Sequence, residues 1–397
     1  MNVCRLLSAL SLTGVTLLGV AHGLAPATKP KPVVQQKPPP APVKKKASPA
    51  ELSPYAAALQ KVAQTGLDRL AAVDGAGDPR YYKDGVWVHD GPVCLRCDVG
   101  PGVTASVLAA VTGNASDRST AIQTMDTAIK LHRLSSGAFG PPAGAESGPD
   151  IQTTFFAVQL GLSLQALSPT LDLAHRTAWG QALAGAVDFL SKNGNFKWYT
   201  NGNIVLTNAV AAAMAWRATG DSRYKAIYDA AFDFALQPPQ TRWPGRGLVT
   251  TTPASAVDPA RAAGFLTEEG PGTPGFDSDY TQMQADMAAM LYLTTGESRA
   301  LNLTSVLVNR MLPLVNQTTW ELDTSGGSRH PAINRVVPFT TCALAVLASN
   351  GRPDLIPLAQ SQSKAIGTVF AESVTYTNIG MYQYWGSRLA PTLLALG

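Results

Sequence analysis

The chain has 397 residues, 45% of them hydrophobic, and carries a formal net charge of +4. Its four cysteines are too few for a fold held together by disulfides, whereas the apolar fraction is ample for a large core. Residues 1–50 contain Arg5 and six lysines but no acid, so the 31 basic residues of the chain fall to 24 in the remainder, against 27 acids, a net charge of −3. The remainder therefore lacks the basic surface of a nucleic-acid-binding domain, and no nucleic-acid partner is expected.

The first 23 residues have the features of a secretory signal peptide. Arg5 precedes an apolar stretch over 6–20, and Ala21-His22-Gly23 provides a small-x-small cleavage pattern. This stretch contains Ser, Thr and Gly and is shorter than a membrane span, so we expect a secreted, periplasmic or envelope-associated protein without a transmembrane segment. Residues 24–50 are rich in Pro and Lys, which predicts a disordered linker, or a cationic tether to an anionic cell envelope.

Residues 51–397 are predicted to form one all-helical domain. Apolar residues recur at spacings of three and four in twelve segments, which is the periodicity of amphipathic helices. The predicted helices span 52–73, 100–112, 117–133, 151–167, 172–192, 203–219, 222–236, 278–295, 298–315, 338–350, 354–372 and 379–395. Three of them end at Thr-Gly pairs, at 112–113, 219–220 and 295–296. Each Gly suits the left-handed position past a helix end, and Asn, Asp or Ser follows to cap the next helix.

The connections between these helices alternate in length. Those after the even-numbered helices are short and predict antiparallel neighbours, whereas most of those after the odd-numbered helices are long. All long loops then lie at one end, beside the N-termini of the even-numbered helices. Six hairpins with this asymmetry predict an (α/α)6 toroid whose even-numbered helices form the inner ring; an open helical solenoid is the alternative. Helices 203–219 and 278–295 carry few charges, as expected of inner helices.

The long loops concentrate aromatic and charged residues. Flat aromatic faces beside charges and amides suit a sugar ring, so we expect Trp87, Trp198, Tyr199 and Trp243 to bind a glycan. The alternative for each tryptophan is a packing role under its loop.

Two segments lead directly into inner helices. In the first, either Asn201 or Asn203 caps the helix and the other presents its amide to the cavity, where a helix N-terminus favours an anion. In the second, Asp277 or Ser278 is the cap, and Asp279, Tyr280 and Gln284 lie toward the cavity mouth. A tyrosine there can transfer protons when an arginine lies beside it; the alternative is a packed core tyrosine.

A third loop carries Arg329 and His330, followed by Arg335. Pro331 disfavours a helical conformation for His330, and a histidine in a loop is a candidate for proton transfer.

The cysteines predict local structure rather than chemistry. Cys94 and Cys97 are expected to form a local disulfide, or, with His89, a zinc site that lacks a clear fourth ligand. Cys342 reads as an inert packed thiol. No metal and no cofactor are expected at the site.

These features together resemble the six-hairpin (α/α)6-toroid carbohydrate-active enzymes, which include glycoside hydrolases and the toroid domains of polysaccharide lyases. Trp198-Tyr199 ahead of Asn201 and Asn203 is similar to the aromatic-plus-Asn entry of hyaluronate- and chondroitin-type lyases. The C-terminal β-sandwich of those lyases is missing here.

The resemblance implies catalytic roles for particular residues. Asn203 would neutralise a uronate carboxylate, while His330 and Tyr280 would transfer protons. Arg329 or Arg335 would support them. Apart from the resemblance, Asp279 is a candidate catalytic residue, and Asp277 is expected to contact the substrate. The sequence therefore favours an exported enzyme that cleaves a polysaccharide by β-elimination.

Two alternatives remain. A glycoside hydrolase needs two carboxyl groups, for which the long loops offer Asp98, Asp150, Glu268, Glu269, Asp277 and Asp279. A non-catalytic glycan-binding toroid would keep the aromatic residues but have no convergent acid–base pair.

Overall fold

The computed structural model describes residues 49–74, 82–83, 86–87, 95–140, 149–192, 201–255, 261–271, 273–316, 319, 321–329, 331, 336–338, 341–371 and 379–396. All of them belong to one compact unit, Val43–Gly397. The predicted signal peptide and almost all of the predicted linker lie outside the described residues and stay predictions. Within the described ranges, no helix combines the length and apolarity needed to cross a bilayer.

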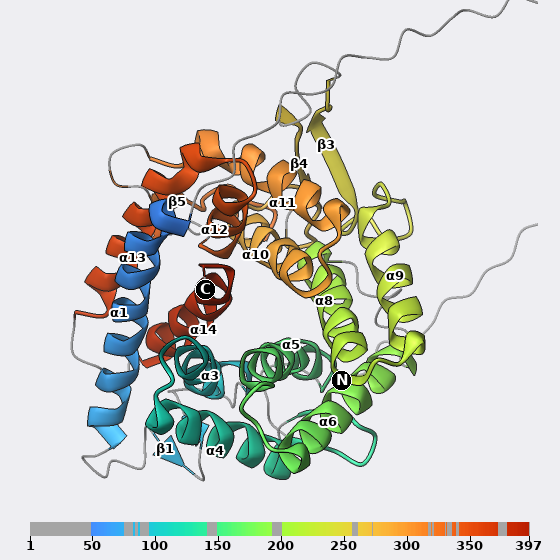
Figure 1. Ribbon diagram of the computed structural model, residues 1–397. Helices are drawn as coiled ribbons and strands as arrows, with labels where there is room; N and C mark the ends of the chain where they lie inside the picture. Colours follow the sequence, from blue (N-terminus) through green and yellow to red (C-terminus); the bar gives the residue numbers. More distant parts are fainter. Residues whose placement is uncertain are drawn as a thin grey trace, which may run out of the picture. The chain divides into compact units, whose positions relative to one another are not determined.

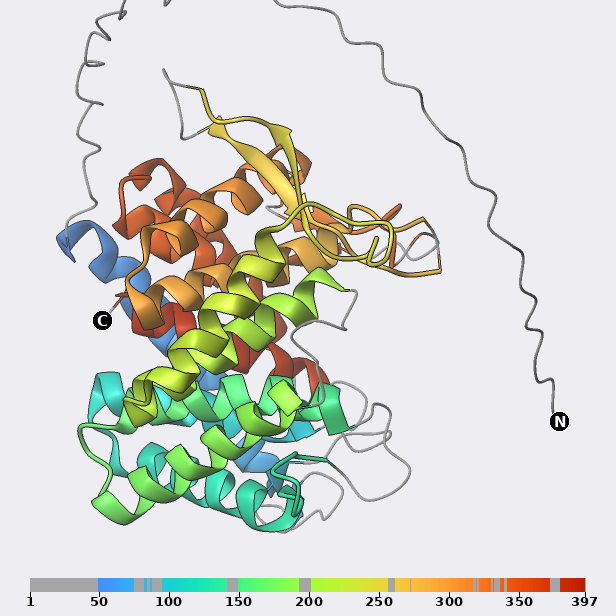
Figure 2. The same cartoon turned by 90° about the vertical axis from the view of Figure 1, so that its right-hand side faces the viewer.

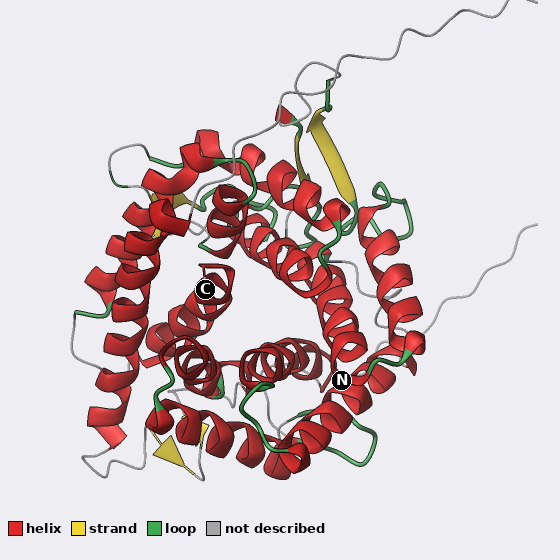
Figure 3. Cartoon of the chain, viewed as in Figure 1, coloured by secondary structure: helices red, strands yellow, loops and turns green. Residues whose placement is uncertain are grey.

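In the part of the chain that the structure describes, twelve helices of 8 to 26 residues form two concentric rings, as Figures 1 and 3 show. The inner helices are α3 (Gly100–Thr112), α5 (Pro149–Leu167), α8 (Gly202–Thr219), α10 (Ser278–Thr295), α12 (Cys342–Ser349) and α14 (Ile379–Leu396). The outer helices are α1 (Pro49–Asp74), α4 (Ala115–His132), α6 (Leu173–Lys192), α9 (Ser222–Leu236), α11 (Ser298–Met311) and α13 (Ile356–Val369). A short helix, α2 (Leu95–Asp98), precedes α3, and two 3₁₀ turns cover Leu312–Leu314 and Pro353–Leu355.

The inner ring is closed. Each inner helix packs against the next one around the ring, and the last, α14, packs against both α12 and α3. Each outer helix packs on one or two neighbouring inner helices, and the first, α1, covers the last inner helix, α14 (Figure 1). The prediction of an (α/α)6 toroid is therefore confirmed, and the open solenoid is excluded.

The hairpin turns follow the predicted chemistry. Gly113, Gly220 and Gly296 have φ of 74°, 70° and 72°, and each donates its N–H to the carbonyl four residues earlier. Asn114 and Asp221 then accept backbone N–H groups of α4 and α9. These short turns all lie between the end of an inner helix and the start of an outer helix.

The described parts of the long loops lie at the opposite end; Figure 2 shows the yellow segments between α9 and α10 on that side. Among the described residues, these loops carry three antiparallel two-stranded hairpins. These pair β1 (Tyr82–Lys83) with β2 (Val86–Trp87), β3 (Leu248–Thr252) with β4 (Ala263–Leu266), and β5 (Glu321–Asp323) with β6 (Val336–Pro338). In the second hairpin, Leu248 pairs with Leu266. Residues 267–270 follow β4 directly. They pass the N-terminus of α8, where the N–H of Gly202 donates to the carbonyl of Thr267.

Burial explains the division into two rings. Every residue of α8 from Gly202 to Ala215 is buried, because this inner helix packs against helices on all sides. On outer helix α9 the buried residues are instead spaced for one face, at Tyr224, Tyr228, Ala231, Phe232 and Ala235.

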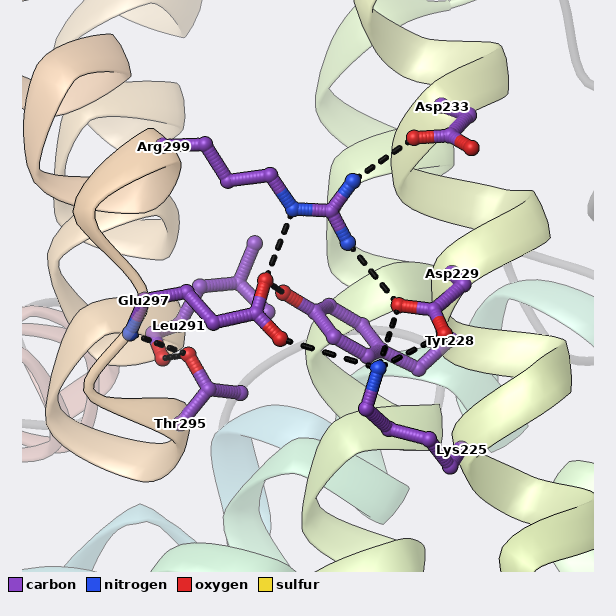
Figure 4. A network of polar contacts seen from close by, with 8 residues as sticks. All are labelled: Lys225, Tyr228, Asp229, Asp233, Leu291, Thr295, Glu297 and Arg299. Carbon is purple, nitrogen blue, oxygen red and sulfur yellow. Dashed lines mark hydrogen bonds and ion pairs between the residues drawn. The ribbon is translucent and has the colours of Figure 1, made fainter.

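A network of charged side chains joins two neighbouring hairpins on the outer surface (Figure 4). We call it the clasp; it consists of Lys225, Tyr228, Asp229 and Asp233 of α9 with Glu297 and Arg299 of the next hairpin. The Arg299 guanidinium donates to Glu297 Oε2 at 2.7 Å and contacts Asp233 at 2.6 Å and Asp229 at 2.9 Å. Because the Tyr228 hydroxyl also donates to Glu297 at 2.7 Å, the clasp holds α9 against the start of α11.

Candidate functional site

A buried carboxyl group lies between the N-terminal parts of inner helices α8 and α10. The side chain of Glu268 is 0% exposed, and its Oε1 accepts two hydrogen bonds. The backbone N–H of Asn203, in the first turn of α8, donates at 2.6 Å, and Nε2 of Gln284 on α10 donates at 2.7 Å. Glu268 therefore connects two adjacent inner helices at the long-loop end of the ring.

The environment of Glu268 favours its neutral form. Burial raises the pKa of this carboxyl to about 8, although the hydrogen bonds from Asn203 and Gln284 and the charge of Arg329 act in the opposite direction. The charge of Asp277 adds a smaller upward effect. The second carboxyl oxygen of Glu268, Oε2, has no hydrogen-bond partner among the described residues. The group is thus mostly protonated at neutral pH.

Arg329 joins a second long loop to this cluster. Its backbone N–H donates to Asp277 Oδ2 at 2.9 Å, and its Nη1 donates to the carbonyl of Glu269 at 2.9 Å. The guanidinium lies 4.8 Å from the centre of the Tyr280 ring, and its Nη2 is 3.4 Å from the tyrosine hydroxyl. The sequence prediction placed Arg329 and Tyr280 at one site, and the structure brings them into contact.

Asp277 caps α10. Its Oδ1 accepts the N–H of Tyr280 at 3.1 Å, its Oδ2 accepts the N–H of Arg329, and the residue is 0% exposed. Ser278, the other predicted cap, is the first residue of the helix. Asp277 therefore contributes by fixing the start of α10 and the Arg329 loop.

A stripe of polar residues runs along α10 toward the interior of the ring. Asp279, Gln282 and Asp286 follow at spacings of three and four, so they share one face of the helix. Asp286 shows which face it is, because its carboxylate accepts the N–H of Ala343 on α12 and pairs with Arg388 on α14, both at 3.0 Å. Asp279, which is half-buried, accepts a hydrogen bond from Gln282 at 3.1 Å near the mouth of the ring.

The two asparagines at the start of α8 lie in different surroundings, and their proposed roles toward a substrate stay predictions. Asn201 is at the N-cap position but makes no capping hydrogen bond with its side chain. Its Oδ1 accepts the N–H of Glu269 at 3.0 Å instead. The side chain of Asn203 is 4% exposed, while its backbone N–H binds Glu268. At the N-terminus of α8, the sequence predicted an asparagine cap or a bound anion. The structure instead places the carboxyl of Glu268 there, from a different segment.

Other predicted site residues lie elsewhere or outside the described residues. Trp243 packs edge-on against Phe234 of outer helix α9, with ring centres 5.5 Å apart, and its role in glycan binding stays a prediction. Trp198, Tyr199, His330, Arg335 and Cys94 lie outside the described residues, as do the side chains of Trp87 and Cys97. Their proposed roles in substrate binding, proton transfer and disulfide formation stay predictions.

Sequence reasoning missed Gln282, Asp286 and Arg388. A signal was present for Gln282 and Asp286, because they follow Asp279 at helical spacing on an inner helix; no local signal pointed to Arg388. A cavity of about 250 Å³ lies at the other end of the ring, among the C-terminal ends of α5, α8 and α10, with Met214, Arg217 and Thr294 in its wall. It is separate from the Glu268 cluster.

Comparisons with known proteins support the fold. No family model and no curated protein sequence matches this chain. Its structure is similar to that of a glycosyl hydrolase family 88 protein from Bacteroides vulgatus, with a TM-score of 0.52, 10% sequence identity, and coverage of 85% of this chain and 99% of the other. It is also similar to an unsaturated glucuronyl hydrolase variant from Streptococcus agalactiae complexed with dGlcA-GalNAc6S, with a TM-score of 0.50, 12% identity, and coverage of 91% and 98%. These likenesses show that the chain has the helical-toroid fold of known glycoside hydrolases.

Proposed function

We propose that this protein is a glycan-cleaving enzyme, and specifically a glycoside hydrolase, whose active site is the mouth of the ring at the long-loop end. The observation that carries this proposal is the gathering of four carboxyl-bearing residues with Arg329 and Tyr280 at the starts of two adjacent inner helices. The four acids are Glu268, Glu269, Asp277 and Asp279. Hydrolysis of a glycosidic bond needs two carboxyl groups, one as acid and one as base or nucleophile.

Burial divides these four acids into two classes. Glu268 and Asp277 are fully buried and bind backbone N–H groups, so they serve the structure of the site. Glu269 and Asp279 are only half-buried. We therefore assign the two substrate-facing carboxyl groups to Glu269 and Asp279. Arg329, held over Tyr280, would add a positive charge for an acidic sugar.

The substrate that we propose is a glycan or oligosaccharide with a uronic acid residue. The arginine supports this, because a guanidinium binds a carboxylate through paired hydrogen bonds. One structural neighbour is described as an unsaturated glucuronyl hydrolase, which makes unsaturated uronides a natural first set of substrates. The predicted signal peptide would bring the enzyme to such glycans outside the cell.

The test is a hydrolysis assay with a panel of saturated and unsaturated uronides and neutral glycans. Reducing ends should increase for at least one uronide without a gain in the absorbance of unsaturated uronyl groups. Changing Glu269→Gln or Asp279→Asn should lower kcat by at least about a hundredfold. The exposed Asp68→Asn on α1 is the control and should keep full activity. If both site variants remain fully active, the assignment of the two carboxyl groups is wrong.

β-Elimination is the second candidate, because the contact between Arg329 and Tyr280 suits a tyrosine that transfers the C5 proton of a uronide. In the same assay a lyase would increase both the reducing ends and the absorbance of the unsaturated product. His330→Ala and Tyr280→Phe would then abolish both signals. Full activity of His330→Ala would exclude its predicted role in proton transfer.

A further inference from the structure

We propose that Glu268 is a positioning residue of this site, which holds Glu269 and Arg329 in place through a carboxyl group anchored between α8 and α10. The inference deepens the proposed function and rests on it for its catalytic readout. No atom of Glu268 reaches the surface, so its influence must pass through the residues that it fixes.

The connection from Glu268 to the mouth is short. Its backbone forms two hydrogen bonds with Gly275, N–H to carbonyl at 2.9 Å and carbonyl to N–H at 3.0 Å. The adjacent Glu269 is held by Asn201 through its N–H and by Arg329 through its carbonyl. A shift of the Glu268 carboxyl would therefore move both Glu269 and the guanidinium that binds it.

The packing around this segment leaves no room for independent movement. A Cβ atom added to Gly202 would lie 2.7 Å from both Cβ of Leu266 and the carbonyl oxygen of Thr267, so the start of α8 presses directly on the chain before Glu268. A Cβ at Gly270 would overlap the carbonyl oxygen of Ser328, next to Arg329. Because both ends of the segment are in contact with neighbouring backbone, movement at Glu268 is transmitted rather than absorbed.

The charge state of Glu268 decides whether its carboxyl is accommodated between α8 and α10. Helices α8 and α10 face the carboxyl with the neutral groups of Asn203 and Gln284. The charged groups near it are Arg329, from the loop between β5 and β6, and Asp277, before α10. A neutral carboxyl satisfies both hydrogen bonds to Oε1 without placing a charge on the unpartnered Oε2. Loss of the proton would place a buried negative charge there, close to Asp277.

Glu268→Gln tests the proposal because it reproduces the shape of the protonated carboxyl but cannot ionise. The wild-type enzyme should lose kcat/KM as the pH rises through about 8. The Glu268→Gln variant should keep kcat/KM at neutral pH within about threefold and should lack this alkaline decline. The exposed Glu51→Gln on α1 is the matched control and should keep the wild-type pH profile.

Two results would overturn the proposal. A folded Glu268→Gln variant without activity at any pH would make Glu268 a catalytic acid, and an unchanged alkaline decline would show that its proton does not matter. Glu268→Ala, which leaves the Asn203 N–H without an acceptor, should lose activity even where it folds.

The proposed function can fail separately. If the wild type cleaves no glycan, the positioning role is read from hydrogen exchange of the Asn203 and Glu269 amides. The protection factor of the Glu269 amide, which donates to Asn201, should fall above about pH 8 in the wild type and stay constant in Glu268→Gln. The Asn203 amide, which donates to the carboxyl itself, is the internal reference. Equal pH dependence in both proteins would overturn the positioning role by itself.

Discussion

Two consecutive glutamates in one loop have opposite environments. Glu268 is turned inward between α8 and α10, and Glu269 is half-buried beside Arg329. The sequence identified both as candidate carboxyl groups but could not distinguish them. Which of the two points inward depends on the pairing of Glu268 with Gly275 and of Leu248 with Leu266. Both pairings join separate segments, and a shift of the pairing by one residue would exchange the two side chains.

At the residue scale, the stability of the fold should depend on pH through Glu268. The folded chain keeps this proton up to about pH 8, whereas the unfolded chain releases it near 4.5. Because the folded state then binds more protons, the free energy of unfolding should fall by about 1.4 kcal/mol per pH unit between about pH 5 and 8. Urea unfolding of the wild type and Glu268→Gln should show a difference in slope of this size. Parallel pH dependences would contradict the prediction.

The helices themselves were predictable because their signals are local. Apolar spacing, the Thr-Gly turns and the capping residues are all contained within a few neighbouring positions, and every predicted helix is present. Several predicted boundaries were wrong by three or four residues. Helix α11 stops at Met311, where a 3₁₀ turn containing Pro313 follows, rather than at 315. Helix α12 begins at Cys342 rather than at 338, and α13 ends at Val369 rather than at 372. The three strand pairs were missed because each strand has only two to five residues and pairs with a separate segment.

At the scale of the elements, the clasp should stabilise the contact between the α9 and α11 hairpins. Arg299 contacts three carboxylates and lies over the rings of Tyr228 and Phe232. Arg299→Met should lower the free energy of unfolding by about 1–2 kcal/mol, more than an isolated surface ion pair contributes. Urea denaturation at low and high salt measures this. Arg176 is an exposed residue of α6, so Arg176→Met should change the free energy of unfolding by less than about 0.5 kcal/mol.

Two glycines in different helices give a second test at this scale. Gly161 lets α5 approach α8, since a Cβ there would lie 2.6 Å from Sδ of Met214. Gly161→Ala should therefore destabilise the protein by about 1–3 kcal/mol. Gly180, inside α6, has nothing within 4 Å of an added Cβ, so Gly180→Ala should stabilise it by about 0.5–1 kcal/mol. Equal changes in melting temperature for both variants would show that the contact between α5 and α8 tolerates a methyl group at position 161.

For the whole molecule, ring closure was predictable from the alternation of loop lengths, but the residues that meet in its interior were not. The ion pair of Asp286 with Arg388 joins positions 102 apart, and nothing in the local sequence relates them. The hairpin of α14 with α1 is equally non-local, because its two helices come from opposite ends of the folded unit. The end of α14 and the start of α1 lie where a sixth short turn would join an inner helix to an outer helix.

A circular permutant tests this description. Residues 396 and 49 would be joined by a short linker, and the chain would be opened between Gly220 and Asp221, at a turn where nothing lies within 4 Å of an added Cβ. We expect this permutant to fold with wild-type helicity and to keep the activity of the same unpermuted unit. Opening the chain instead between Gly270 and Pro271 should keep the helices but abolish activity. Failure of the first permutant to fold would contradict the equivalence of the six turns.

The pairing of the first helix with the last has a consequence for biosynthesis. Until α14 leaves the ribosome, both α1 and α3 lack the helix that covers their apolar sides. The growing chain therefore exposes an apolar edge until α14 is synthesised, and such an edge favours aggregation.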